Sequence, residues 1–110
     1  MATMVRPEPY ILAFAEAVKD HLRAIEAKYH APIREKIGEQ LRFEPGVETR
    51  NRKPLRQPAP FGATWEIRFG PNSRFRVLYD IDVLTRTVQI LAIGEKQRER
   101  LFVGGKEVQL

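Results

Sequence analysis

Two arginines in neighbouring predicted strands are the side chains that point most directly to chemistry. Arg68 and Arg76 each lie in a short run that alternates apolar and polar residues, and residues 70–74 (GPNSR) between the runs have the composition of a turn. If Phe69 pairs with Phe75 across this turn, Arg68 lies directly opposite Arg76 on one face. Like charges in that arrangement destabilise a hairpin. Because converging guanidinium groups bind phosphate or carboxylate well, we expect an anion site on this face.

The elements that must position this site are three strands. Period-two alternation predicts strands at 65–69 and 75–82, with Leu78 and Asp80 on the charged face beside Arg76. On that face we expect Asp80 to orient or neutralise Arg76. The third run, 87–93 (TVQILAI), is apolar at nearly every position, which predicts a central strand covered on both faces.

The residues that follow the third run add positive charge to the same region. A hairpin between the second and third strands places Gly94 beside the start of the Arg76 strand. Lys96 and Arg98 follow directly, so we expect both to project near Arg68 and Arg76. Four cations from three segments are then gathered around one site.

The first part of the chain predicts a helical hairpin that covers the sheet. Residues 10–14 (YILAF) fit either a strand or the start of a helix. A helical stripe follows over 15–29, a break is expected at 30–32, and a second helix begins near Pro32. The two stripes consist of Phe14, Val18, Leu22, Ile25 and Tyr29, and then of Ile33, Ile37 and Leu41. We therefore predict one α+β domain over 1–110, with two helices packed on a small, mainly antiparallel twisted sheet. If 10–14 is a strand, the order of elements is β-α-α-β-β-β.

Composition narrows the class of protein. The chain has 110 residues and a net charge of +5, all of which lies in the last 70 residues. That asymmetry favours a polyanion partner and is equally consistent with a basic surface that has no dedicated ligand. Without cysteine and with two histidines, the chain predicts no metal site. No apolar run is long enough to cross a membrane and no signal-peptide pattern is present, so we expect a cytoplasmic protein that needs no cofactor.

A basic loop precedes the predicted hairpin. Residues 44–64 contain four prolines and a cluster of cations, which are Arg50, Arg52, Lys53 and Arg56. These side chains either follow a phosphate backbone or line a solvated connector. A short extended piece is expected at 53–55.

The order of these elements, together with several short motifs, resembles the RelE/ParE toxin superfamily, in particular its RelE-like branch of cytotoxic translational repressors. The resemblance covers about residues 10–110. The motifs that carry it are ETRNRKPL (48–55), WEIR (65–68), FRVLYD (75–80), LAIGEK (91–96) and VGGKEV (103–108).

The resemblance implies a toxin of a type II toxin–antitoxin pair that cleaves mRNA at the ribosome. In that reaction a 2′-hydroxyl attacks the adjacent phosphate, and cations stabilise the charge that develops. It implies catalytic roles for Arg76, Arg68 and Lys96, a cognate antitoxin as partner, and the ribosome and mRNA as targets. The RNA-binding residues that we expect are Arg50, Arg52, Lys53, Arg56, Arg74, Arg98 and Phe102.

Two positions depart from the family pattern. Glu66 stands where the family has a second lysine, and Phe102 stands where it has a catalytic tyrosine. Phe102 can stack on a base but cannot transfer a proton. Glu66 serves either as a base or, as we favour, in a salt bridge to Arg68 or Arg76. Two alternatives stay open, a ParE-like poison of DNA gyrase and a non-catalytic module that binds an antitoxin or nucleic acid.

Overall fold

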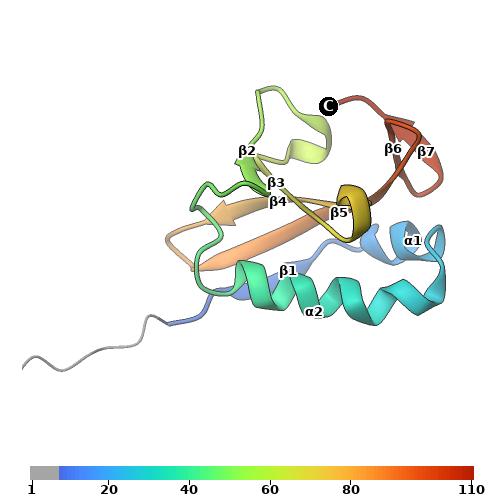
Figure 1. Cartoon of the computed structure of the whole chain (residues 1–110). Helices are drawn as coiled ribbons and strands as arrows, with labels where there is room; N and C mark the ends of the chain where they lie inside the picture. The colour runs from blue at the N-terminus through green and yellow to red at the C-terminus, as the bar shows by residue number, and fades with distance from the viewer. Residues whose placement is uncertain (1–7) are drawn as a thin grey trace, which may run out of the picture.

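The chain folds as an α+β domain in which two helices cover one face of a mainly antiparallel sheet (Figure 1). The computed structural model describes residues 8–110. Its elements are β1 (Ile11–Phe14), α1 (Val18–Arg23), α2 (His30–Leu41), β2 (Arg52–Pro54), β3 (Trp65–Phe69), β4 (Phe75–Asp82), β5 (Thr87–Gln97), β6 (Arg100–Val103) and β7 (Lys106–Val108). Short 3₁₀ turns lie at Ala27–Tyr29 (η1), Pro60–Gly62 (η2) and Pro71–Ser73 (η3). No helix within residues 8–110 is long and apolar enough to cross a bilayer.

The sheet has the order β2-β3-β4-β5-β6-β7, and β1 pairs in parallel with the first half of β5. The predicted hairpin register is confirmed, because Phe69 pairs with Phe75 and Arg68 with Arg76. Aromatic residues that flank a short turn and alternate with polar ones fix the register, since a slip by one residue would expose them. The segment 10–14, which the sequence left open, is a strand.

β5 is the central strand that its apolar sequence predicted. It pairs with β4 along its length, with β1 over its first residues and with β6 over its last. Gly94 lies beside Arg76, as expected. A β-carbon at Gly94 would meet the Leu101 Cδ1 at 2.8 Å and the Phe102 carbonyl oxygen at 3.0 Å. Glycine at this position therefore lets β6 pass close to β5.

The first helix is shorter than predicted. α1 ends at Arg23, and the chain then turns through an extended Glu26 before η1 and α2. The break expected at 30–32 is wrong, because α2 begins at His30 and Pro32 lies in its first turn. The His30 Nε2 lies 2.7 Å from the Ile25 carbonyl oxygen and binds the turn to α2. Phe14 belongs to β1 and is 47% exposed, so it is not part of the buried stripe.

Two apolar clusters lie on opposite faces of the sheet. The larger one, between helices and sheet, contains Val18, Ile25, Ile33, Ile37, Leu41, Ile67, Phe75, Val77, Tyr79, Val88, Ile90 and Ile93. The smaller one contains Ala63, Leu78, Ala92, Leu101 and Val103. The expectation that Leu78 lies on an exposed charged face is therefore wrong, because residues of the 55–64 loop, β6 and β7 cover that part of the face.

A buried histidine closes a gap in the hydrogen bonding of β5. The backbone pairing of β1 ends with the Ala15 N–H donating to the Ile90 carbonyl, and β6 begins its pairing at Gly94. Between these points the Ile93 N–H donates to the Nδ1 of His21 at 3.3 Å. Burial lowers the pKa of His21, partly opposed by the nearby Asp20 carboxylate. The neutral imidazole can accept this bond and the protonated form cannot.

Candidate nucleic-acid interface

The centre of the candidate site is a carboxylate held by two arginines. Arg68 and Arg76 lie opposite each other on β3 and β4, and Glu66 lies two residues before Arg68 on the same face. The Arg68 Nη2 and Nε donate to the Glu66 Oε1 at 2.8 and 3.0 Å. The Arg76 Nη1 lies 3.9 Å from the Glu66 Oε2. Glu66 thus makes the salt bridge that we favoured from the sequence.

Arg76 is the less exposed of the two arginines, with 15% of its side chain exposed against 38% for Arg68. Its Nε is buried and makes no hydrogen bond to the described residues. Burial lowers the pKa of Arg76, as does the charge of Arg68, whereas Glu66 and Glu99 act in the opposite direction. A further anion would stabilise the positive charge of Arg76, because the Glu66 carboxylate is at the limit of ion-pair distance.

Arg68 and Arg76 define a cationic face of the sheet, and Lys96 extends this face along β5. Gly94 pairs with Arg76, and strand alternation places Lys96 on the same face two residues further on. The Lys96 Nζ forms an ion pair with Glu99 Oε1 at 3.5 Å, and 26% of the lysine side chain is exposed. Arg76 and Glu99 line a hollow of about 200 Å³ that also borders the C-terminal strand. The three strands β3, β4 and β5 therefore each contribute one cation to this face, and Glu66 and Glu99 are their carboxylate partners.

The loop cations do not form one group. Lys53 pairs with Glu66 across β2 and β3, so it lies on the cationic face and is exposed, as are Arg50 and Arg56. Arg52 is only 4% exposed. Its guanidinium donates to the Val47 carbonyl at 3.0 Å and to the Gln40 carbonyl and side chain at 2.8 and 3.1 Å. The structure thus contradicts a surface role for Arg52, which instead ties the loop to the end of α2.

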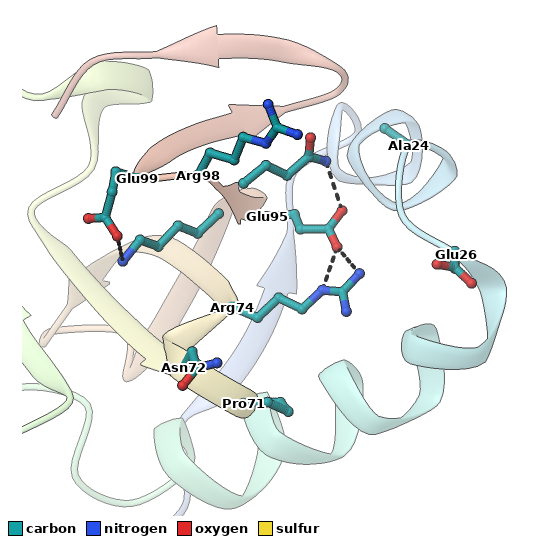
Figure 2. A pocket seen from close by; sticks show the side chains of 10 residues that line it. Ala24, Glu26, Pro71, Asn72, Arg74, Glu95, Arg98 and Glu99 are labelled. Atoms are coloured by element: carbon teal, nitrogen blue, oxygen red, sulfur yellow. Dashed lines mark hydrogen bonds and ion pairs between the residues drawn. The ribbon is translucent and has the colours of Figure 1, made fainter.

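Arg74 and Arg98 lie at the end of the sheet, around a hollow of about 660 Å³ (Figure 2). Arg74 is engaged by Glu95, with the Arg74 Nε and Nη2 each 2.6 Å from the Glu95 Oε2. Its Nη1 lies 3.2 Å from the Tyr29 hydroxyl. Arg98 is exposed in the two-residue turn between β5 and β6, where its φ of 49° and that of Glu99, 66°, are both left-handed.

Phe102 lies on the other face of the sheet. Val103 pairs with Gly94, so Phe102 pairs with Glu95 and shares the helix-covered side. It lines a separate hollow with His21, Ala24 and Ile25. The structure thus does not bring Phe102 together with Arg76.

Asp80 has a different partner from the one expected. Its Oδ1 accepts a hydrogen bond from the Thr64 hydroxyl at 2.6 Å, so the expected contact with Arg76 is wrong.

Two carboxylates of the region were not singled out from the sequence. Glu95 holds Arg74, and Glu99 holds Lys96. The i, i+3 spacing of Lys96 and Glu99 in the sequence is a signal for the second pair. The contact of Glu95 with Arg74 depends on the pairing of β4 with β5 and has no local signal.

The arrangement is suited to binding a phosphate. Arg68, Arg76 and Lys96 lie in three adjacent paired strands. They can hold the oxygens of a phosphodiester once the carboxylates that pair with them are displaced. Among residues 8–110 no group of three or more histidine, aspartate or glutamate side chains is placed to hold a metal ion.

Comparison with solved structures shows a likeness to a toxin–antitoxin complex. A chain of the toxin–antitoxin complex RelBE2 from Mycobacterium tuberculosis superposes with a TM-score of 0.65 at 27% sequence identity. The match covers 83% of this chain and 95% of that chain. No family model and no curated protein matches the sequence. The likeness, together with the order of helices and strands, shows a RelE-like fold.

Proposed function

We propose that this protein is the toxin of a type II toxin–antitoxin pair and cleaves mRNA at the ribosome. The observation that carries the proposal is the convergence of Arg68, Arg76 and Lys96 on one face of a RelE-like fold. The likeness to a chain of a toxin–antitoxin complex supports the wider class of function.

The proposed reaction is an internal transesterification of RNA. The 2′-oxygen of one nucleotide forms a bond to the adjacent phosphorus, the bond to the 5′-oxygen of the next nucleotide breaks, and a 2′,3′-cyclic phosphate remains. The 2′-hydroxyl loses its proton and the leaving 5′-oxygen gains one. Arg76 and Arg68 stabilise the charge on the non-bridging oxygens, and Lys96 supplies charge or a proton at the leaving oxygen.

Glu66 acts in this proposal through the arginines that it holds. Its Oε1 accepts from Arg68 at 2.8 Å and its Oε2 faces Arg76 at 3.9 Å, so both oxygens are turned toward cations. Because the two arginines face both of its oxygens, Glu66 is engaged as their ion-pair partner. Glu66 therefore orients the guanidinium groups, and most of the rate enhancement comes from preorganised charge.

The partner that we propose is an antitoxin, and the edge strand β1 offers it a surface. Ile11 and Phe14 of β1 are 64% and 47% exposed. Two hollows of about 510 and 500 Å³ meet there, and both are lined by Phe14 and Arg34. An exposed apolar edge strand is a place where a partner segment adds to a sheet. Because Lys19, Arg34 and Arg42 flank these hollows, a segment with apolar and acidic residues fits better than a second copy of this basic chain.

One observation favours a second candidate function, a module that only binds nucleic acid or an antitoxin. Phe102 has no hydroxyl and lies on the opposite face from Arg76, so it cannot transfer a proton at the cationic site. Induction of the protein alone in a bacterial host tests mRNA cleavage, with the 5′ ends of an abundant mRNA mapped within minutes. Cuts in translated regions that disappear with Arg76→Ala, while Arg86→Ala retains them, are the expected result.

Other outcomes of the same experiment decide against mRNA cleavage. Growth arrest with intact mRNA and inhibited supercoiling would indicate a gyrase poison, and absence of arrest would indicate the binding module. Circular dichroism and thermal unfolding of each variant establish that the Arg76 variant is folded.

A further inference from the structure

The hollow at the end of the sheet contains an arginine whose position is unusually well fixed. The Arg74 guanidinium donates to the Glu95 carboxylate and to the Tyr29 hydroxyl. Its central carbon also lies 4.6 Å from the centre of the Tyr29 ring and 5.6 Å from that of Phe75. Ion pair, hydrogen bond and ring contacts together define one orientation of the guanidinium plane.

This fixed guanidinium is not enclosed. Its side chain is 36% exposed and lines the hollow of about 660 Å³. Figure 2 shows the Arg74–Glu95 pair between Arg98 on one side and Pro71 and Asn72 on the other. A flat cation that is fixed in orientation and borders an open hollow is a surface on which a nucleobase can stack, because RNA-binding proteins use guanidinium planes as well as aromatic rings for this purpose.

The hollow also offers groups that can contact the edge of a base. Asn72 is exposed in η3 with a φ of 55°, and its amide can donate and accept hydrogen bonds at once. Neither Asn72 nor Arg98 takes part in any of the interactions drawn between the lining residues in Figure 2. Both are therefore available to a ligand, whereas each nitrogen of the Arg74 guanidinium already contacts Glu95 or Tyr29.

The hollow is continuous with the cationic face. Lys96 and Glu99 line it, and Glu99 also lines the smaller hollow that contains Arg76. The Lys96 N–H donates to the Arg74 carbonyl at 2.7 Å, which ties the last residues of β5 to the chain just before β4. A strand of RNA whose phosphate lies at Arg76 and Lys96 can thus place a neighbouring base over Arg74.

We propose that this hollow is a binding site for one nucleobase of the RNA, in which Arg74 is the stacking platform, Asn72 contacts the edge of the base and Glu95 positions Arg74. The inference rests on the proposed RNA-binding function and assigns to Arg74 a role that depends on its shape and not on its charge. It gives the protein a base preference at one position beside the scissile phosphate.

The test is an abasic scan of binding. Short single-stranded oligonucleotides with 2′-O-methyl groups, which block cleavage, carry one abasic position that is moved along the strand. Affinities are measured by fluorescence anisotropy. For the wild type we expect one position at which loss of the base weakens binding about tenfold, the effect of one stacked base. Arg74→Lys keeps the charge but removes the plane, so it should abolish that sensitivity.

The matched control is Arg86→Lys. Arg86 also lies over a tyrosine, with its central carbon 4.3 Å from the centre of the Tyr10 ring, but it precedes the opposite end of β5. It should leave the abasic profile unchanged. Asn72→Ala should weaken the preference among the four bases at the sensitive position, while Arg76→Ala should weaken binding of all the oligonucleotides alike.

A flat abasic profile in the wild type, or a profile that Arg74→Lys leaves unchanged, would overturn the base site. These outcomes differ from failure of the proposed function. A protein that cuts mRNA but has a flat profile retains its function without this site, whereas one that shows the profile but never cuts has the site without the catalysis.

Discussion

Arg68 and Arg76 lie directly opposite each other on paired strands, and the Glu66 carboxylate lies close to both guanidinium groups. The sheet thereby holds two like charges together that repulsion would otherwise separate. The stability of the free protein depends on the Glu66 carboxylate. Its affinity for a phosphate depends on how strongly the carboxylates of the site compete for the same cations.

Replacement of Glu66 tests the first dependence. Glu66→Gln removes the buried charge between two arginines and leaves them to repel each other, so the free energy of unfolding should fall by about 1–3 kcal/mol. The estimate is at the lower end for a buried pair because Arg68 is 38% exposed and screened by solvent. Urea unfolding measures the change, with Glu107→Gln at an exposed pair as control. Equal stability of the two variants would contradict the structural role of Glu66.

Replacement of Glu99 tests the second dependence. Glu99 forms an exposed ion pair with Lys96, so Glu99→Gln should free the lysine and strengthen RNA binding by a factor of about two to five. The control is Glu39→Gln, which breaks another i, i+3 pair, Lys36–Glu39 at 3.6 Å, on α2. Fluorescence anisotropy at several salt concentrations measures both. Weaker binding by the Glu99 variant would show that this carboxylate assists the ligand and does not compete with it.

The buried His21 predicts a loss of stability in mild acid. Burial lowers its pKa in the folded state, so the unfolded chain takes up a proton more readily. The contribution is complete above the unfolded pKa of about 6.5 and is lost as the pH falls from there through the folded pKa. His21→Asn retains an acceptor for the Ile93 N–H and should flatten this part of the profile. Unfolding free energies between pH 5 and 8 provide the comparison, and identical slopes would exclude His21 as the source.

Replacement of Arg52 should change the stability of the fold, whereas replacement of Arg50 should change RNA binding. Arg52→Ala leaves the Val47 and Gln40 carbonyls without their charged donor, so it should destabilise the fold by about 2–4 kcal/mol. Arg50 is exposed, and Arg50→Ala should weaken RNA binding while the melting temperature stays within experimental error. Thermal unfolding and RNA titration of both variants make the test. A stable Arg52 variant with impaired RNA binding would restore the surface role that its position in the basic loop suggested.

The sequence by itself determined the fold class and the centre of the site. Period-two alternation with Phe69 and Phe75 at the turn specified the register that places Arg68 opposite Arg76. The apolar run of β5 predicted a central strand, and the position of Lys96 after it predicted its place on the cationic face. These features are local or involve adjacent strands, for which a short pattern is sufficient.

Only the tertiary structure decided which of the remaining side chains face solvent. Leu78 alternates with charged residues yet is buried, because β6 and the 55–64 loop return over that face. Arg52 lies among exposed cations yet is buried, because the loop folds back on the end of α2. Phe102 follows the cationic segment but points to the other side, since its face is fixed by the pairing of Val103 with Gly94. Each outcome depends on contacts between segments far apart in the chain, which local patterns do not encode.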